Sequence, residues 1–189
     1  MSKLTKEQLL KIMDNESIKN DYKLQDYKTF FETGTYEGET LLELESCFEK
    51  LISIEISEKL FYKNIFNTEI NANKIFLKLG DSSKLIKKIL ENNNDNILYW
   101  LDGHYSKGNN TGRGDKDVPL LEELKYIQTR YKKDIIIIDD YRLFGTYQNE
   151  DWAEITLQNI LNIFLKEQIF TYFILEDRLC IFLKEFNND

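Results

Sequence analysis

Hydrophobic and polar positions follow two different periods along this chain. Short apolar runs between polar turns predict strands at 28–33, 51–56, 74–79, 97–102 and 135–138. Between these runs, apolar residues recur every three or four positions, which predicts helices at 38–50, 58–70, 83–91 and 151–167 and one that begins at Pro119. Strands that alternate with helices in this way indicate an α/β fold with a doubly wound, mostly parallel sheet.

The C-terminal part departs from this alternation. Two apolar runs, 170–175 and 179–183, are separated by only three residues. So short a connection cannot carry the crossover that parallel strands need, and the two runs must therefore form an antiparallel hairpin. With the five strands before it, the hairpin completes a predicted sheet of seven strands.

Residues 1–27 are predicted to form an N-terminal helical segment before the main domain at 28–189. Thr5 and Gln8 fit a capping box, and an apolar stripe follows them. Three roles stay open for this segment. It covers the active site, it takes part in a homodimer, or it packs as a first helix.

Composition narrows the choice of partners and location. A chain of 189 residues, 42% of them hydrophobic, fits one folded domain. The net charge of −8 argues against nucleic acid or an anionic membrane as a partner, because both bind clustered Lys and Arg. No apolar stretch has the length of a membrane span or the position of a signal core, and Cys47 and Cys180 lie in apolar runs without metal-ligand spacing. We therefore expect a cytoplasmic protein with reduced cysteines.

The connection between the first predicted strand and helix carries the strongest functional signal. It reads ETGTYEG over 32–38. Gly34 lets the backbone approach a ligand closely, and Gly38 lets the next helix pack tightly. The Gly-x-Gly-x-x-Gly spacing of a dinucleotide site is absent. A carboxylate such as Glu32 would repel a pyrophosphate, whereas it would suit an ammonium or a sulfonium.

Two further strand ends carry polar side chains. Glu55, 23 residues after Glu32, ends the second strand, where an acid can accept hydrogen bonds from both hydroxyls of a ribose. Asp81 and Ser82 follow the third strand and are placed to meet an adenine edge. Strand-end acids also cap the next helix without binding a ligand, and that alternative stays open for each of them.

With these motifs, residues 28–185 resemble a class I S-adenosylmethionine (SAM)-dependent methyltransferase, and the macrocin O-methyltransferase-like group most closely. The family usually has a third glycine between the other two, whereas this chain has Tyr36 there. The resemblance implies that the acid and the glycines border the methionine moiety, Glu55 the ribose and Asp81 the adenine. The implied cofactor site comprises Glu32, Thr33, Gly34, Thr35, Gly38, Glu55, Ile56, Asp81, Ser82 and Asp102.

A second group of acids follows the fourth and fifth strands, which are neighbours in a doubly wound sheet. Asp102, Asp139 and Asp140 are expected to converge there, and three such carboxylates repel one another unless a cation or a shared proton neutralises them. Oxygen ligands favour Mg²⁺, Mn²⁺ or Ca²⁺ over zinc, and Mg²⁺ is the metal we expect. In the resembling group these positions hold a divalent metal. The alternative is that the three acids only cap helices, bond backbone amides or face solvent.

His104 is the only histidine and lies two residues beyond Asp102. It is predicted to be the general base, with Asp102 as a second catalytic residue; the alternative is a bystander. The polar loop 106–117 is either a lid over the acceptor or a plain insertion.

Together these features predict an enzyme, a SAM-dependent O-methyltransferase. The resemblance implies that the acceptor is a small sugar-like or polyhydroxylated molecule, and a divalent metal is expected to assist. Two other functions stay open: a non-catalytic SAM-binding regulatory protein, and a nucleotide-sugar or NAD oxidoreductase. The missing dinucleotide glycines and the terminal hairpin disfavour the oxidoreductase.

Overall fold

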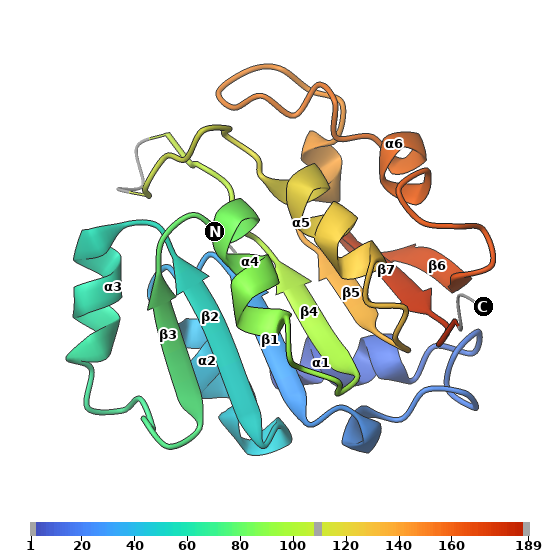
Figure 1. Ribbon diagram of the computed structural model, residues 1–189, viewed down its shortest axis with the longest axis horizontal. Coiled ribbons are helices and arrows are strands. Elements are labelled where there is room, and N and C mark those ends of the chain that lie inside the picture. Colours follow the sequence, from blue (N-terminus) through green and yellow to red (C-terminus); the bar gives the residue numbers. More distant parts are fainter. Residues whose placement is uncertain (1–2, 108–110, 187–189) are drawn as a thin grey trace.

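A seven-stranded sheet forms the centre of the computed structural model, which describes residues 3–107 and 111–186 (Figure 1). In sheet order the strands are β3 (Ile75–Leu79), β2 (Lys50–Glu55), β1 (Thr29–Thr33), β4 (Ile97–Leu101), β5 (Ile135–Ile138), β7 (Arg178–Leu183) and β6 (Ile169–Leu175). All strand pairs are parallel except β5–β7 and β6–β7. The predicted doubly wound sheet with a terminal hairpin is confirmed, and β7 inserts between β5 and β6.

The central strands are buried on both faces, as their continuous apolar runs predict. Successive residues of β5 point into two different cores: Ile136 and Ile138 into one, Ile135 and Ile137 into the other. Strand β4 divides in the same way. The sheet therefore separates two hydrophobic layers, each of which needs its own cover of helices.

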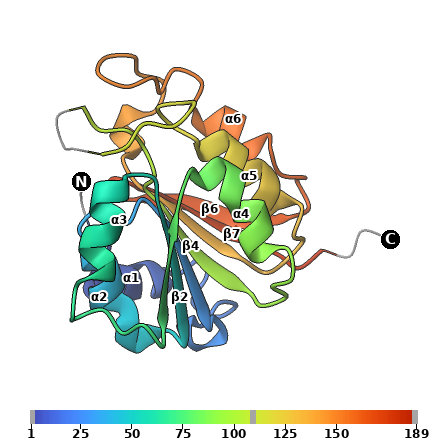
Figure 2. The same cartoon turned by 60° about the vertical axis from the view of Figure 1, so that its left-hand side comes forward.

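Helices supply both covers (Figures 1 and 2). On one face lie α4 (Ser82–Leu90), α5 (Leu120–Gln128) and α6 (Leu157–Leu161). On the other face lie α1 (Lys6–Met13) and α2 (Glu39–Leu44), while α3 (Glu58–Ile65) packs beside β3 and β2. Three short 3₁₀ turns complete the list: η1 (Leu24–Asp26), η2 (Glu45–Cys47) and η3 (Tyr141–Leu143).

The N-terminal segment is helical only in part, over α1 and η1. The predicted capping box is present: the Thr5 side chain accepts from the Gln8 backbone, and the Gln8 side chain accepts from the Thr5 backbone. Leu9 and Ile12 of α1 are fully buried against the core layer that contains Phe30 of β1. Helix α1 thus packs as a first helix of the same domain.

Three predicted helices are too long. Helix α2 stops at Leu44 and continues as η2, α3 stops at Ile65, and the helix predicted at 151–167 covers only Leu157–Leu161. In the last case Trp152 and Ile155 are buried from an irregular loop rather than from a helix. Their spacing mimics a helical period because loop and helix side chains pack into the same core.

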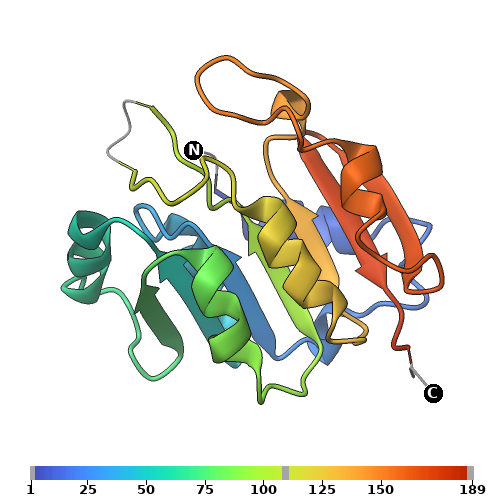
Figure 3. The same cartoon turned by 45° about the horizontal axis from the view of Figure 1, so that its top comes forward.

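The sheet order fixes where a ligand can bind. Strand order reverses between β1 and β4, and in such sheets a crevice opens beyond the carboxyl ends of those strands. Two long connections, after β4 and after β5, rise from this edge (Figure 3). Among the described residues, no helix is both long and apolar enough to cross a bilayer.

Candidate active site

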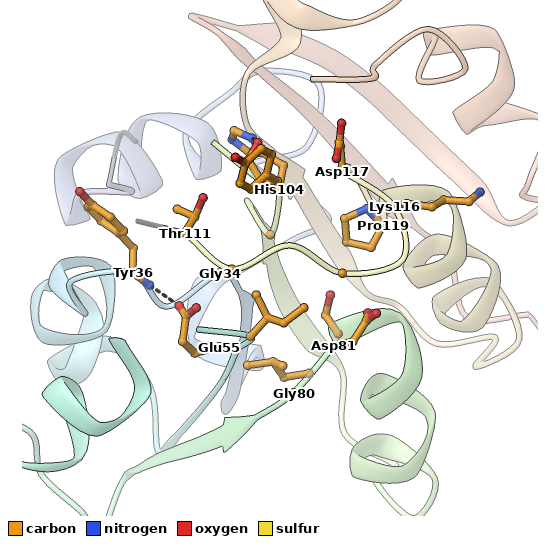
Figure 4. A pocket seen from close by; sticks show the side chains of 17 residues that line it. Gly34, Tyr36, Glu55, Gly80, Asp81, His104, Thr111, Lys116, Asp117 and Pro119 are labelled. Atoms are coloured by element: carbon orange, nitrogen blue, oxygen red, sulfur yellow. Dashed lines mark hydrogen bonds between the residues drawn. The ribbon is translucent and has the colours of Figure 1, made fainter. Parts of the chain in front are cut away.

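A cavity lies at the carboxyl ends of β1, β2, β3 and β4. Figure 4 shows Glu55 and Asp81 on one side of the segment that carries Thr111 and Lys116, and His104 on the other. Four predicted cofactor residues besides Glu55 line the cavity: Gly34, Ile56, Asp81 and Ser82. Residues predicted from four separate strand ends thus meet around one space, as the sheet topology requires.

The turn after β1 touches the end of β4 so closely that side chains are excluded. A Cβ atom on Gly34 would lie 2.6 Å from the backbone oxygen of Asp102, and one on Gly103 would lie 2.9 Å from the Thr33 side chain. Tyr36 has a φ of 49°, the left-handed region that glycine enters most readily. The chain keeps the backbone path of a glycine turn with a tyrosine in it.

Glu55 is buried, and its carboxylate is held by the backbone. Its Oε2 accepts a hydrogen bond from the Tyr36 N–H at 2.9 Å, and its Oε1 accepts one from the Ser57 N–H at 2.7 Å. Burial raises the pKa of Glu55, and these backbone hydrogen bonds oppose the rise. A carboxylate oxygen has a second lone pair, so both oxygens can also accept from a diol.

Asp81 and Ser82 both have structural partners. Asp81 is the N-cap of α4, where its Oδ1 accepts from the Ser83 N–H at 3.0 Å. The Ser82 hydroxyl donates to buried Glu123 of α5, whose pKa burial raises to about 7. The capping alternative is therefore true of Asp81, yet both residues still line the cavity. Capping and ligand contact do not exclude each other.

The remaining residues of the first turn lie around this cavity rather than on its wall. Glu32 is 1% exposed and accepts a hydrogen bond from the Ser53 hydroxyl, which also contacts the Thr35 hydroxyl. Burial raises the pKa of Glu32 to about 8. Thr35 lines a smaller hollow on the other side of the Gly34 turn, together with Asp102. Gly38 packs against Asn64 of α3, and its lack of a side chain lets the two segments lie close together.

A buried cluster of ionisable groups lies between β4 and β5. Asp102, His104 and Asp140 place their ligand atoms within 4.8 Å of one another. His104 Nε2 is 2.9 Å from Asp140 Oδ2 and 3.4 Å from Asp102 Oδ1. Asp140 adopts a φ of 58°, a strained conformation that aspartate tolerates better than most residues. The structure thus brings two of the three predicted metal ligands together with the predicted base.

The third predicted ligand, Asp139, lines a hollow together with Asp102 and His104 and also lies next to an arginine. Asp139 Oδ1 lies 3.5 Å from Nε of Arg178, a buried arginine of β7 that also sits over the Trp100 ring. Asp139 and Asp140 are consecutive, so their side chains leave the chain in different directions. The metal set of Asp102, Asp139 and Asp140 stays a prediction, and the described residues whose ligand atoms lie within 4.8 Å of one another are Asp102, His104 and Asp140.

The pKa values in this cluster differ from those the sequence suggests. Burial alone would lower the pKa of His104, but the carboxylates of Asp102 and Asp140 raise it to about 10. Burial raises the pKa of Asp102 to about 7, against the opposing effect of His104. For Asp140, His104 and Arg142 outweigh burial and lower the pKa. The two carboxylates thus favour the protonated form of the imidazole, whereas a cation held between them would favour the neutral form.

Sequence reasoning missed two residues that hold His104 in place. Glu150 Oε2 lies 3.2 Å from His104 Nδ1 and accepts a hydrogen bond from Trp152 Nε1 at 3.0 Å. The Trp152 ring meets the imidazole edge-on, with 5.1 Å between ring centroids. Both residues come from the loop before α6, where the helix predicted at 151–167 included Trp152 and left out Glu150.

The described part of the loop 106–117 folds back over the cavity. A Cβ atom on Gly112 would lie 2.6 Å from Ile56, and one on Gly114 would lie 2.9 Å from Asp81. An ion pair between Lys84 of α4 and Asp115, 2.7 Å long, holds this segment from outside. Residues 108–110 of the loop lie outside the described residues.

No protein-family model and no curated protein matches the sequence. Solved structures do match. The cofactor-bound protein Rv0187 from MTB has a TM-score of 0.61 at 13% identity and covers 86% of this chain and 75% of its own. The O-methyltransferase TomG from Streptomyces achromogenes, in complex with SAM, has a TM-score of 0.56 at 11% identity. The match covers 85% of this chain and 74% of TomG. An rRNA methylase from Streptococcus thermophilus has a TM-score of 0.53 at 14% identity. The match covers 86% of this chain and 89% of the methylase. The chain therefore has the class I SAM-dependent methyltransferase fold.

Proposed function

We propose that this protein transfers a methyl group from SAM to an oxygen atom of a small polyhydroxylated acceptor. The observation that carries the proposal is the cavity at the switch point of the sheet, where Gly34, Glu55 and Asp81 from three strand ends face one space. Next to it lies the buried cluster of Asp102, His104 and Asp140. A methyl-transfer site needs such a pair: a pocket for the donor and, beside it, polar groups for the acceptor.

The residues around the cavity fit the parts of SAM. Glu55 would accept hydrogen bonds from the ribose hydroxyls, Ile56 would pack on the adenine, and Asp81 would accept from the adenine amino group. Gly34 and its neighbours would border the methionine end, where the buried acid Glu32 and the hollow lined by Thr35 and Asp102 lie. When bound, SAM supplies an electrophilic methyl group on a sulfonium.

The cluster fits a divalent metal. His104 Nε2 and Asp102 Oδ1 are buried without a hydrogen-bond partner, although they lie within ion-pair distance. Unsatisfied buried polar atoms are costly, and a cation among them would remove the cost. Asp102, His104 and Asp140 are the residues that would hold it; a bound metal would supply Lewis acidity towards an acceptor hydroxyl.

The chain's own groups then position the acceptor and take its proton. Asp102, which lines the hollow beside the Gly34 turn, is the carboxylate that would accept the proton. His104 and Asp140 hold the reacting oxygen close to the donor pocket, and the segment Thr111–Asp117 and the loop with Glu150 exclude water from it. The acidic surface of this chain, with a net charge of −8, suits a neutral sugar-like acceptor better than a nucleic acid.

Calorimetry separates this proposal from its rivals. S-adenosylhomocysteine (SAH) and NAD are each titrated into the protein with and without a divalent metal. Binding of SAH supports the donor site, while binding of NAD alone supports an oxidoreductase; absence of SAH binding sinks the proposal.

A methyl-release assay then tests the activity across sugars, nucleotide sugars and ribosomal RNA. SAH binding without turnover on any of these favours the regulatory protein. His104→Gln is expected to lower turnover and to leave SAH affinity unchanged, because the cluster lies on the acceptor side. Equal turnover would remove His104 from the mechanism.

A further inference from the structure

The surroundings of His104 indicate more than the presence of a metal. Its two ring nitrogens face different environments. Nδ1 lies 3.2 Å from the Glu150 carboxylate and 3.3 Å from the backbone carbonyl oxygen of Tyr105, with the Ser106 hydroxyl at 3.4 Å. The carboxylate and the carbonyl only accept hydrogen bonds, so Nδ1 is the nitrogen that carries hydrogen.

Nε2 faces the two aspartates instead. It lies 2.9 Å from Asp140 and 3.4 Å from Asp102, yet it makes a well-directed hydrogen bond to neither. The His104 and Asp102 side chains are only 5% and 4% exposed, so water does not satisfy these atoms from outside. Three ligands at about 2.1 Å from one ion stand roughly 3.0–3.4 Å apart, close to the two distances found here.

We propose that His104 is a metal ligand through Nε2, that Glu150 orients it, and that this mixed site binds first-row transition ions, of which Mn²⁺ is the probe used below, in preference to Mg²⁺. The inference deepens the proposed function by naming the ion class and the positioning residue. An outer carboxylate on the distal nitrogen of a ligating histidine fixes its tautomer and its ring orientation. Here Glu150 is itself held by the Trp152 N–H, so the carboxylate has a defined position.

The donor set carries the metal preference. Mg²⁺ requires oxygen ligands in near-ideal octahedral geometry, whereas an imidazole nitrogen favours first-row transition ions. One histidine and two aspartates therefore shift the site away from the Mg²⁺ that three aspartates would favour. The Trp152 ring also restricts the orientation of the imidazole. If the imidazole rotated away from the carboxylates, it would lose its edge-on contact with Trp152.

The test uses tag-free protein, because His104 is the only histidine of the chain. Calorimetry with MnCl₂ and MgCl₂ is expected to give at least about 10-fold tighter binding of Mn²⁺. Pulsed EPR of the Mn²⁺-loaded protein is expected to show imidazole ¹⁴N coupling, which only His104 can supply. Equal affinities without ¹⁴N coupling overturn the proposal, and the wild-type spectrum decides this even if a His104 variant fails to fold.

Variants test the role of Glu150 separately. Glu150→Gln keeps an acceptor for the Trp152 N–H but removes the charge beside Nδ1, and is expected to weaken Mn²⁺ binding roughly 10- to 100-fold. Glu154→Gln, on the same loop but facing an outer polar cavity, is the matched control and should bind Mn²⁺ as the wild type does. An unchanged affinity in Glu150→Gln overturns its positioning role.

SAH binding, measured on the same samples, keeps the two proposals apart. If SAH fails to bind while Mn²⁺ binds with ¹⁴N coupling, the methyltransferase function is refuted and the metal site is supported. If SAH binds and methyl transfer proceeds with no preference for Mn²⁺ and no ¹⁴N coupling, the function stands and this inference falls.

Discussion

The two ends of the sheet differ in how completely their buried charged side chains are hydrogen-bonded. At the amino ends of β4 and β5, Arg130 and Asp134 form an ion pair of 3.1 Å in which both side chains are almost fully buried. Arg130 also donates to the backbone oxygens of Asn93 and Asp95, and Asp134 accepts from the Ile97 N–H. At the carboxyl ends, Asp102 and His104 are just as buried, yet one atom of each has no hydrogen-bond partner.

The difference lies in whether the protein itself supplies a hydrogen-bond partner for every buried charged atom. Burial raises the pKa of Asp134 to about 6 even beside Arg130, which shows that burying this carboxylate is costly. The hydrogen bonds that Arg130 and Asp134 make to the backbone offset this cost. At the other end, partners from the protein are missing where a ligand would supply them. A buried polar atom without a partner is thus a better indicator of a site than a buried charge alone.

The largest effect is expected at the structural end. Arg130→Ala leaves Asp134 buried without its charge partner and should lower the free energy of unfolding by about 3–5 kcal/mol. Urea denaturation followed by circular dichroism measures it. Lys132→Ala, which breaks a more exposed pair with Glu185 nearby, is the control and should change stability little. A cost for Arg130→Ala no larger than that of the control would contradict the comparison.

At the functional end, activity and stability should separate. Asp140→Asn keeps a side chain that tolerates the left-handed backbone but removes one charge from the cluster. Methyl transfer should fall at least about 100-fold, while the free energy of unfolding should change by less than about 1 kcal/mol. Asp151→Asn, on the neighbouring loop, should keep its activity. Equal loss of stability and activity would place Asp140 with the structural pair.

Glu32 gives the comparison a pH dependence. Its pKa is about 8 in the fold and near the ordinary 4.5 when unfolded, so the unfolded state loses its proton first as pH rises. Stability should therefore fall between pH 4.5 and pH 8, and Glu32→Gln should remove that fall. The variant should exceed the wild type by up to about 4 kcal/mol at pH 8 and by little at pH 5.

Thermal or urea unfolding at both pH values measures this effect. Glu69→Gln, at an exposed position, is the control and should leave the pH dependence unchanged. SAH affinity of Glu32→Gln adds a second reading, because the predicted contact of Glu32 with the methionine end requires that affinity to drop. Parallel pH profiles of wild type and variant would mean that Glu32 is ionised in the fold.

The smallest effect is expected from a charge pair at the rim. Lys84→Ala removes the exposed pair with Asp115 that holds the segment over the cavity. The unfolding midpoint should stay the same, since exposed pairs stabilise little. The association rate of SAH, followed by stopped flow, should rise roughly twofold because the segment opens more easily. An unchanged rate would mean that this segment does not limit entry to the pocket.

Periodicity and strand ends were enough to predict the sheet, its hairpin and the walls of the cavity. Glu55 and Asp81 were found because parallel topology brings consecutive strand ends together whatever the loops do. The contact of Asp139 with Arg178 could not be predicted, because the sequence placed Arg178 only in a turn. The contact of Glu150 with His104 could not be predicted, because the two residues are far apart in the sequence and no short-range pattern indicates where a loop residue lies in the fold.

The position of β7 also determines when the site can form during synthesis. Strand β5 pairs with β4 on one side and with β7 on the other, and Ile135 meets Phe182 across that second border. Until residues 178–183 have left the ribosome, β5 has an open apolar edge, and Asp139, just beyond it, lacks Arg178. The residues just beyond β5 therefore reach their final surroundings last, after the strands that precede β5 have been synthesised.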